Sequence, residues 1–166
     1  MHTNHQKETE MTKATIIKNY RNTVTLRQME LSEVVQTIQN QAYRELCEPL
    51  RDIYPLVAVR QKYDAMDGLY YLRTKDIPKV CFSSQMENRN KQRVMKVYNG
   101  LVLLEVNNLA GFEEAEAVRK GAGQIPQTLL AFVGASGRSV KMVCRGELFD
   151  GGLPEGDDDI SRFHTN

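Results

Sequence analysis

The residues with the clearest capacity for chemistry are Glu105 and Asn107, which follow an apolar run, Leu-Val-Leu-Leu, at residues 101–104. That run predicts a strand, and side chains on a strand alternate between its two faces. Positions 105 and 107 therefore point the same way and could share one divalent cation, Mg²⁺ or Mn²⁺, or one phosphate group. Because Asn107 is neutral, it is the weaker metal ligand of the two. The alternative is an ordinary strand end, with Asn107 and Asn108 starting a turn.

A second candidate site lies at residues 134–141, Gly-Ala-Ser-Gly-Arg-Ser-Val-Lys. Its small residues, including Ser136 and Gly137, allow backbone amides to approach an anion closely. Arg138 and Lys141 add cations that can form charge-assisted hydrogen bonds to phosphate. We therefore predict that these four residues bind phosphate or nucleotide, with an ordinary hairpin turn as the competing interpretation.

Other charged segments favour simpler interpretations. One basic segment could follow a nucleic-acid backbone, although a solvated loop is the simpler interpretation. It comprises Arg89, Lys91, Arg93 and Lys96. Residues 155–159, Glu-Gly-Asp-Asp-Asp, lack the ligand spacing of an EF-hand loop and are interpreted as a linker and a helix N-cap. No Ser-His-Asp, Cys-His or P-loop arrangement can be assembled from the spacing.

The composition indicates a globular domain without a strong overall charge. The chain has 166 residues, 41% of them hydrophobic, and a net charge of +1, so any anion site must be local. Residues 1–11 carry almost no apolar side chain and predict a mobile tail. Neither a signal peptide nor a membrane span is evident, which predicts a cytoplasmic protein with no membrane partner. The cysteines, too few and too far apart for a disulfide framework, are expected to be reduced and largely buried: Cys47, Cys81 and Cys144.

The elements that must position these sites can be predicted from residue periodicity. Residues 14–20, β-branched and aromatic, predict a first strand. A helix is predicted from Ser32, with Pro49 ending it. Its buried face would comprise Val34, Val35, Ile38, Ala42 and Leu46. A second helical piece is predicted through residues 56–68, and a strand at residues 79–84 after Pro78.

The C-terminal half shows clearer signals. Residues 100–107 predict a longer, central strand that is buried on both faces. Residues 111–121 predict a helix, because acidic residues occupy its first turns and glycines follow its end. Strands at residues 128–133 and 140–144 should form a hairpin around the glycine-containing turn. The order predicts one α+β domain, residues 12–154, with two layers and a mixed or antiparallel central sheet on which helices pack.

Two segments, residues 98–109 and 126–143, carry a resemblance to a known family. They resemble the BT4734-like, or VirE N-terminal, domain family, found chiefly in Bacteroidetes, and the resemblance extends upstream through residues 14–20 and 77–84. That family is similar to the archaeo-eukaryotic primase superfamily, which implies a primase-like or RRM-like core. Its members commonly precede a helicase-like or VirE-type ATPase region in proteins of mobile elements.

The resemblance also implies roles for both candidate sites. In the family, the strand end carries two aspartates that bind divalent metal, and the matching positions here are Glu105 and Asn107. A single carboxylate cannot neutralise a second cation. The hairpin matches a Ser-x-His-like nucleotide-phosphate motif, with Lys141 where histidine stands. A third acidic motif lies further downstream in the family, so residues 155–166 are expected to be a linker and the start of a truncated helix in a longer protein.

Two functional classes follow from these observations. The favoured one is a non-catalytic module that binds nucleic acid or nucleotide, or has a structural role, in a replication or mobile-element protein. The alternative is a metal-dependent primase-polymerase-type nucleotidyltransferase completed by downstream residues. The expected partners are DNA or nucleotide, and a C-terminal ATPase or helicase-like region of the same longer protein.

Overall fold

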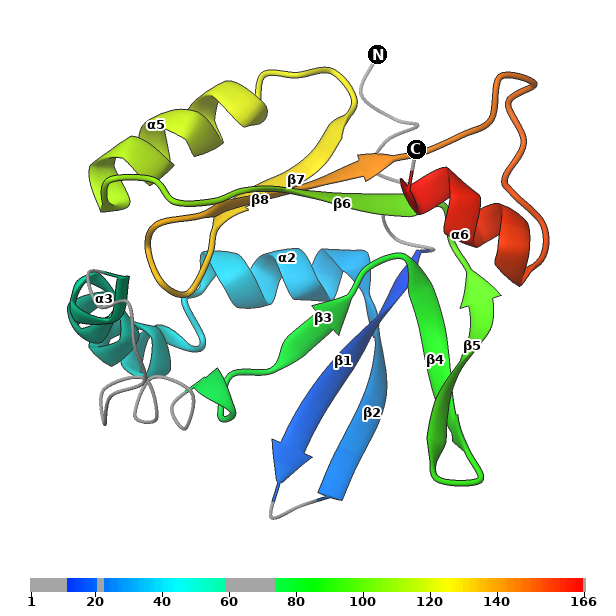
Figure 1. The fold of residues 1–166 in the computed structure, drawn as a ribbon, viewed down its shortest axis with the longest axis horizontal. Helices are drawn as coiled ribbons and strands as arrows, with labels where there is room; N and C mark the ends of the chain where they lie inside the picture. Colours follow the sequence, from blue (N-terminus) through cyan, green and yellow to red (C-terminus); the bar gives the residue numbers. More distant parts are fainter. Residues whose placement is uncertain (1–11, 21–22, 59–73, 166) are drawn as a thin grey trace.

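The computed structural model describes residues 12–20, 23–58 and 74–165, and the predicted N-terminal tail and most of the second helical piece lie outside them. The strands are β1 (Lys13–Tyr20), β2 (Thr23–Glu30), β3 (Lys79–Cys81), β4 (Ser84–Arg89), β5 (Gln92–Tyr98), β6 (Leu101–Val106), β7 (Thr128–Val133) and β8 (Val140–Arg145). The helices are α2 (Leu31–Gln39), α3 (Arg44–Ala58), α5 (Phe112–Ala122) and α6 (Asp157–Thr165) (Figure 1).

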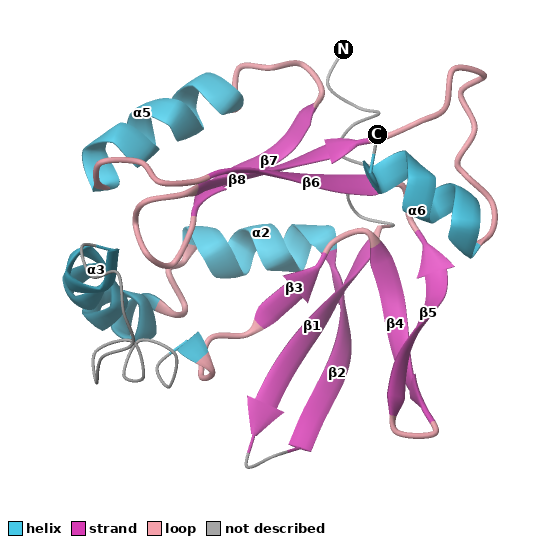
Figure 2. Ribbon diagram, in the orientation of Figure 1, coloured by secondary structure: helices cyan, strands magenta, loops and turns pink. Residues whose placement is uncertain are grey.

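The described strands form three antiparallel sheets, with the orders β2-β1-β3, β4-β5 and β6-β8-β7 (Figure 2). Helices pack on these sheets, so the predicted α+β class is confirmed. The strand pairing is divided among small sheets, whereas the sequence analysis expected one central sheet. Most of the pairing joins strands that are neighbours in the sequence, as in the β1–β2, β4–β5 and β7–β8 pairs.

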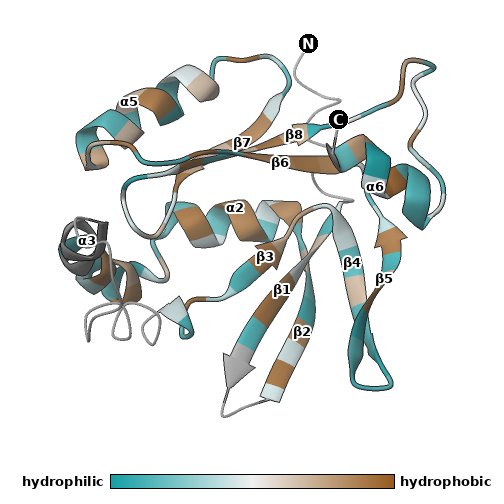
Figure 3. Cartoon of the chain, in the orientation of Figure 1, coloured by the Kyte–Doolittle hydropathy of each residue, from teal (hydrophilic) through white to brown (hydrophobic). Residues whose placement is uncertain are grey.

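The main core lies where helix α2 runs between the two three-stranded sheets (Figure 1). Figure 3 shows apolar residues along α2 and on the strands that face it. The buried cluster comprises Ala14, Ile16, Leu31, Val34, Phe82, Leu101 and Val143. Alternate residues of β1 enter this cluster because the side chains of a strand alternate between its faces. Burial between two sheets therefore fixes α2 and, through Leu101 and Val143, the sheet that carries both candidate sites.

The predicted central position of residues 100–107 is wrong. Strand β6 pairs with β8, but it is the edge of its sheet and β8 is the middle strand. Leu104 is 48% exposed, and Leu103 and Val106 are similarly open to solvent. Helix α5 packs against β7 and β8. A continuous apolar run does not distinguish a strand covered on both faces from an apolar strand at the sheet edge.

The helix predicted from Ser32 to Pro49 is two helices. Helix α2 begins at Leu31, where the side chain of Glu33 accepts a hydrogen bond from the Glu30 amide, as in a capping box. Residue Gln41 has φ +52°, which ends the regular backbone before α3 starts. The buried face predicted for one helix is therefore not continuous, because its last two residues, Ala42 and Leu46, lie outside α2. Pro49 does not end α3, which continues to Ala58 despite the missing amide donor.

Several other predictions are confirmed. Strand β1, helix α5 and the β7–β8 hairpin lie where the sequence placed them. Strand β2 and the β4–β5 hairpin were not predicted. The basic segment, interpreted as a loop, forms part of that hairpin, with Asn90 and Lys91 at its turn in the left-handed region. This backbone matches the right-handed twist of the two strands.

Asn99, between β5 and β6, joins all three sheets. Its Nδ2 donates hydrogen bonds to the carbonyl oxygens of Lys13 at 3.0 Å and Phe82 at 2.6 Å. Its Oδ1 accepts one from the amide of Leu101 at 3.1 Å, and its own amide donates to the Ser83 carbonyl. Lys13 begins β1, Phe82 and Ser83 precede β4, and Leu101 begins β6. One amide side chain therefore connects the starts of strands in three sheets.

We predict that Asn99→Ala lowers the free energy of unfolding by about 1–3 kcal/mol, because it leaves the Phe82 carbonyl and the Leu101 amide without this partner. Urea denaturation measures the change. The control is Asn88→Ala on the exposed surface of β4, for which a change within about 0.5 kcal/mol is expected. Equal effects of the two substitutions would show that Asn99 does not hold the sheets together.

Candidate functional site

Glu105 of β6 and Lys141 of β8 face each other across the sheet edge. The register pairs position 105 with position 141, and Lys141 Nζ donates to Glu105 Oε1 at 2.6 Å. Both side chains are about one-third exposed, so the pair contributes at most about 1 kcal/mol to stability. The structure thus brings a predicted metal ligand and a predicted phosphate ligand together, as an ion pair.

Asn107 follows the end of β6 and is exposed. Asn108 has φ +61°, a left-handed conformation that asparagine tolerates. The chain then crosses to the β7–β8 hairpin, where the Leu109 amide donates to the Arg138 carbonyl at 3.0 Å. The side chain of Arg138 in turn donates hydrogen bonds from Nε and Nη2 to the Ala110 carbonyl. These contacts fix the segment after β6 against the hairpin that carries the second candidate site.

The hairpin turn is narrow and closed by its own hydrogen bonds. The Gly134 amide donates to the Ser139 carbonyl at 2.8 Å, and the Gly137 amide to the Gly134 carbonyl at 3.0 Å. Ser136 Oγ accepts from the Arg138 amide at 3.3 Å. Gly137 has φ +73°, which glycine adopts without strain. All four residues of the predicted phosphate site therefore lie on one turn and the strand that follows it.

Sequence reasoning missed Arg51, which lies against this turn. A Cβ atom at Gly137 would lie 3.3 Å from Arg51 Cγ and Cδ. The Arg51 guanidinium carbon lies 4.7 Å from the ring centroid of Phe112, the first residue of α5. The available signal was a basic residue at helical spacing from Cys47 and Glu48. The interpretation of Pro49 as a helix end removed Arg51 from any helix face.

The described residues do not fit a two-metal centre. Among them, no group of three or more His, Cys, Asp or Glu side chains could hold a metal ion. The Glu105 carboxylate is occupied by Lys141, and neutral Asn107 is a weak ligand. Binding of Mg²⁺ or Mn²⁺ by Glu105 and Asn107 stays a prediction.

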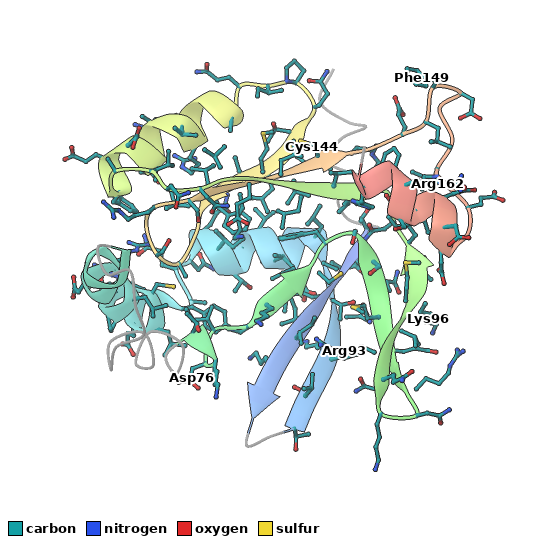
Figure 4. The ribbon with its side chains drawn as sticks, viewed as in Figure 1. Asp76, Arg93, Lys96, Cys144, Phe149 and Arg162 are labelled. Atoms are coloured by element: carbon teal, nitrogen blue, oxygen red, sulfur yellow. The ribbon has the colours of Figure 1, made fainter. Side chains whose placement is uncertain are left out.

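Cysteine chemistry is disfavoured at the thiol nearest to Arg51. Burial raises the pKa of the Cys47 thiol, and the charge of Arg51 lowers it by a smaller amount. The thiol therefore stays protonated at neutral pH and is a poor nucleophile. The three cysteines are free, as predicted, but only half-buried; Cys144 is labelled in Figure 4.

Helix α6 covers the opposite end of the edge strand. His164 Nε2 lies 3.1 Å from the hydroxyl of Tyr98, and a Cβ atom at Gly146 would lie 2.7 Å from the Phe163 ring. The acidic residues at 157–159 occupy the first turn of α6, as the N-cap interpretation predicts. Within the described ranges, no helix has the length and apolar character needed to cross a membrane.

Comparison with known proteins identifies the family. The family model for the BT4734-like, N-terminal domain matches residues 73–166, which is more than half of the chain. The chain therefore belongs to the BT4734-like N-terminal domain family. The matched region begins just before β3 and includes both candidate sites and α6, whereas α2 and α3 precede it. No curated protein and no solved structure matches the chain.

We predict that Gly137→Ala lowers the free energy of unfolding by about 1–2 kcal/mol, because its left-handed backbone disfavours a Cβ atom. Arg51 would also have to shift by a few tenths of an ångström. The matched control is Gly121→Ala in α5, where a Cβ atom meets no neighbour. That change should stabilise the helix by about 0.5–1 kcal/mol. Thermal or urea unfolding that ranks the two variants in the opposite order would contradict this description of the turn.

Proposed function

We propose that this domain binds the phosphate groups of nucleotides or single-stranded DNA at the β7–β8 hairpin, as a non-catalytic module. The observation that carries the proposal is the convergence of Arg138, Lys141 and the end of β6 on one edge of a sheet. Residues 105–110 and 138–141 meet at this edge, and none of them belongs to the buried cluster of the main core.

The chemistry of the turn supports phosphate over other ligands. Ser136 and Gly137 add little bulk, so an anion can approach the turn, where the amides of Gly137 and Arg138 already donate within the turn and the cationic side chains supply the charge. Lys141 has three N–H donors, and its bond to Glu105 uses one of them. Arg138 is positioned by its contact with the Ala110 carbonyl, which limits the loss of side-chain entropy on binding. Arg138 and Lys141 thus place two cations beside a small turn, and each can form a charge-assisted hydrogen bond to phosphate.

The same geometry argues against catalysis. A nucleotidyltransferase site uses carboxylates to hold two metal ions. Here position 107 is an amide, and the carboxylate at position 105 pairs with a lysine. The family resemblance suggests a place for the domain beside an ATPase or helicase-like region in a replication or mobile-element protein. Binding nucleotide or DNA for such a region requires cations and no carboxylates that hold metal ions.

We predict that a fluorescein-labelled single-stranded oligonucleotide binds the domain weakly at low salt and more weakly at moderate salt, because phosphate contacts release counterions. The variant Arg138→Ala with Lys141→Ala should raise Kd by about tenfold or more, since it removes two charge-assisted hydrogen bonds. Arg138 also donates a hydrogen bond to the Ala110 carbonyl, so its substitution can change the structure of the turn. The single variant Lys141→Gln leaves that contact in place and therefore tests binding alone. Fluorescence anisotropy measures each Kd.

The control for this experiment is Arg89→Ala with Lys91→Ala, which removes the same charge from the β4–β5 hairpin. Its Kd should change by less than about threefold. Unchanged binding in the Arg138 and Lys141 variants, or no binding by the parent at low salt, would reduce the β7–β8 turn to a structural feature.

We also predict that the domain shows no metal-dependent extension of primed or unprimed DNA, because positions 105 and 107 supply one carboxylate. Asn107→Asp should bind Mn²⁺ more tightly than the parent, as isothermal titration can measure, if both positions face one site. Extension by the parent protein that disappears in Glu105→Ala would restore the catalytic alternative.

A further inference from the structure

We infer that Arg51 of α3 is a third cationic contact in this site and binds phosphate together with Lys141 and the hairpin turn. The inference rests on the proposed function and assigns a role to a helix that precedes the family match. Arg51 reaches the turn directly, because its Cγ and Cδ lie against Gly137. Gly137 is thus bordered by Arg138 in the chain and by Arg51 in space.

The first observation is an unsatisfied donor. Arg51 Nε is buried and has no hydrogen-bond partner within the described part of the chain. An arginine presents five N–H donors, and a buried donor without a partner costs about 1–3 kcal/mol. Buried polar groups in native proteins nearly always have partners, so each exception requires an explanation. An anionic ligand that opens the contact between Arg51 and Gly137 would supply the missing acceptor, because the Nε atom is covered in this conformation.

The second observation is the contact between the guanidinium and an aromatic ring. The guanidinium carbon lies 4.7 Å from the ring centroid of Phe112, a residue that is 46% exposed. Such a contact holds a cation without neutralising it, because the ring contributes only a quadrupole. A guanidinium held in this way keeps its charge for charge-assisted hydrogen bonds to phosphate oxygens. The Arg51 contacts therefore position its charge and leave it available to a ligand.

The charge distribution provides the third observation. The other cations around the turn have protein partners, since Arg138 bonds the Ala110 carbonyl and Lys141 bonds Glu105. On α3 itself, the neighbouring acid Glu48 pairs with Arg44 at 2.6 Å. Three cations, Arg51, Arg138 and Lys141, thus lie around the hairpin with two carboxylates, Glu105 and Glu114, because Glu114 accepts a hydrogen bond from the Ala110 amide. The local excess of one positive charge favours binding of an anion.

The test compares three variants by fluorescence anisotropy with a labelled oligothymidylate and with inorganic triphosphate as competitor. Arg51→Met keeps the aliphatic packing against Gly137 and removes the charge, whereas Arg51→Lys keeps the charge and loses the planar fork. Arg44→Met is the control on the same helix, because Arg44 lies in an exposed ion pair. Urea unfolding of each variant separates binding from folding.

We expect Arg51→Met to raise Kd for both probes by about tenfold without lowering stability. The slope of log Kd against log salt concentration should fall by about 1, because one phosphate contact is lost. The Kd of Arg51→Lys should lie between those of Arg51→Met and the parent, and the Kd of Arg44→Met should lie within twofold of the parent's.

One result would overturn this inference and leave the proposed function intact: an unchanged Kd in Arg51→Met together with weakened binding in Lys141→Gln. If Arg51→Met lowers stability as well as binding, the Kd of Arg51→Lys distinguishes the two roles. Binding equal to that of the parent in Arg51→Lys would show that Arg51 is purely structural. A parent that binds neither probe would overturn both proposals.

Discussion

The fold depends on one amide side chain. Asn99 bonds the Lys13 and Phe82 carbonyls and the Leu101 amide, so the starts of β1, β4 and β6 are fixed relative to one another. The sheets have two or three strands each, and a two-stranded sheet such as β4–β5 is at best marginally stable alone. The two three-stranded sheets pack around helix α2 and bury a common core, and Asn99 joins the β4–β5 sheet to them. The position of β6 follows from this joint, because the strand leaves it directly at Leu101.

The candidate site lies at the far end of the same strand, where geometry is set by register. Pairing of β6 with β8 places position 105 opposite position 141, so a carboxylate and an amine meet. The β7–β8 turn then projects past the end of β6 and contacts both the following loop and helix α3. Rigid elements on three sides thus hold the cations, and this preorganisation lowers the entropy cost of binding an anion.

Local signals predicted the C-terminal half well. Helix α5 has acids at its start and glycines at its end, and the β7–β8 turn contains glycine where a positive φ is needed. The edge position of β6 could not be predicted, because it depends on β8, a later segment, pairing between β6 and β7. Helix α3 continues through Pro49, so a proline does not by itself mark the end of a helix. Arg51 was missed with it, since its contacts with Gly137 and Phe112 join segments far apart in the sequence.

The central claim is that phosphate binds at this turn, and amide and arginine Nε–H signals of the ¹⁵N-labelled domain report on it directly. Titration with a short oligothymidylate should shift the signals of residues 134–141 and the Nε–H of Arg51. Signals of the β4–β5 hairpin, which carries Arg89 and Lys91, should stay in place. Shifts confined to that hairpin, or no shifts at millimolar oligonucleotide, would contradict the account.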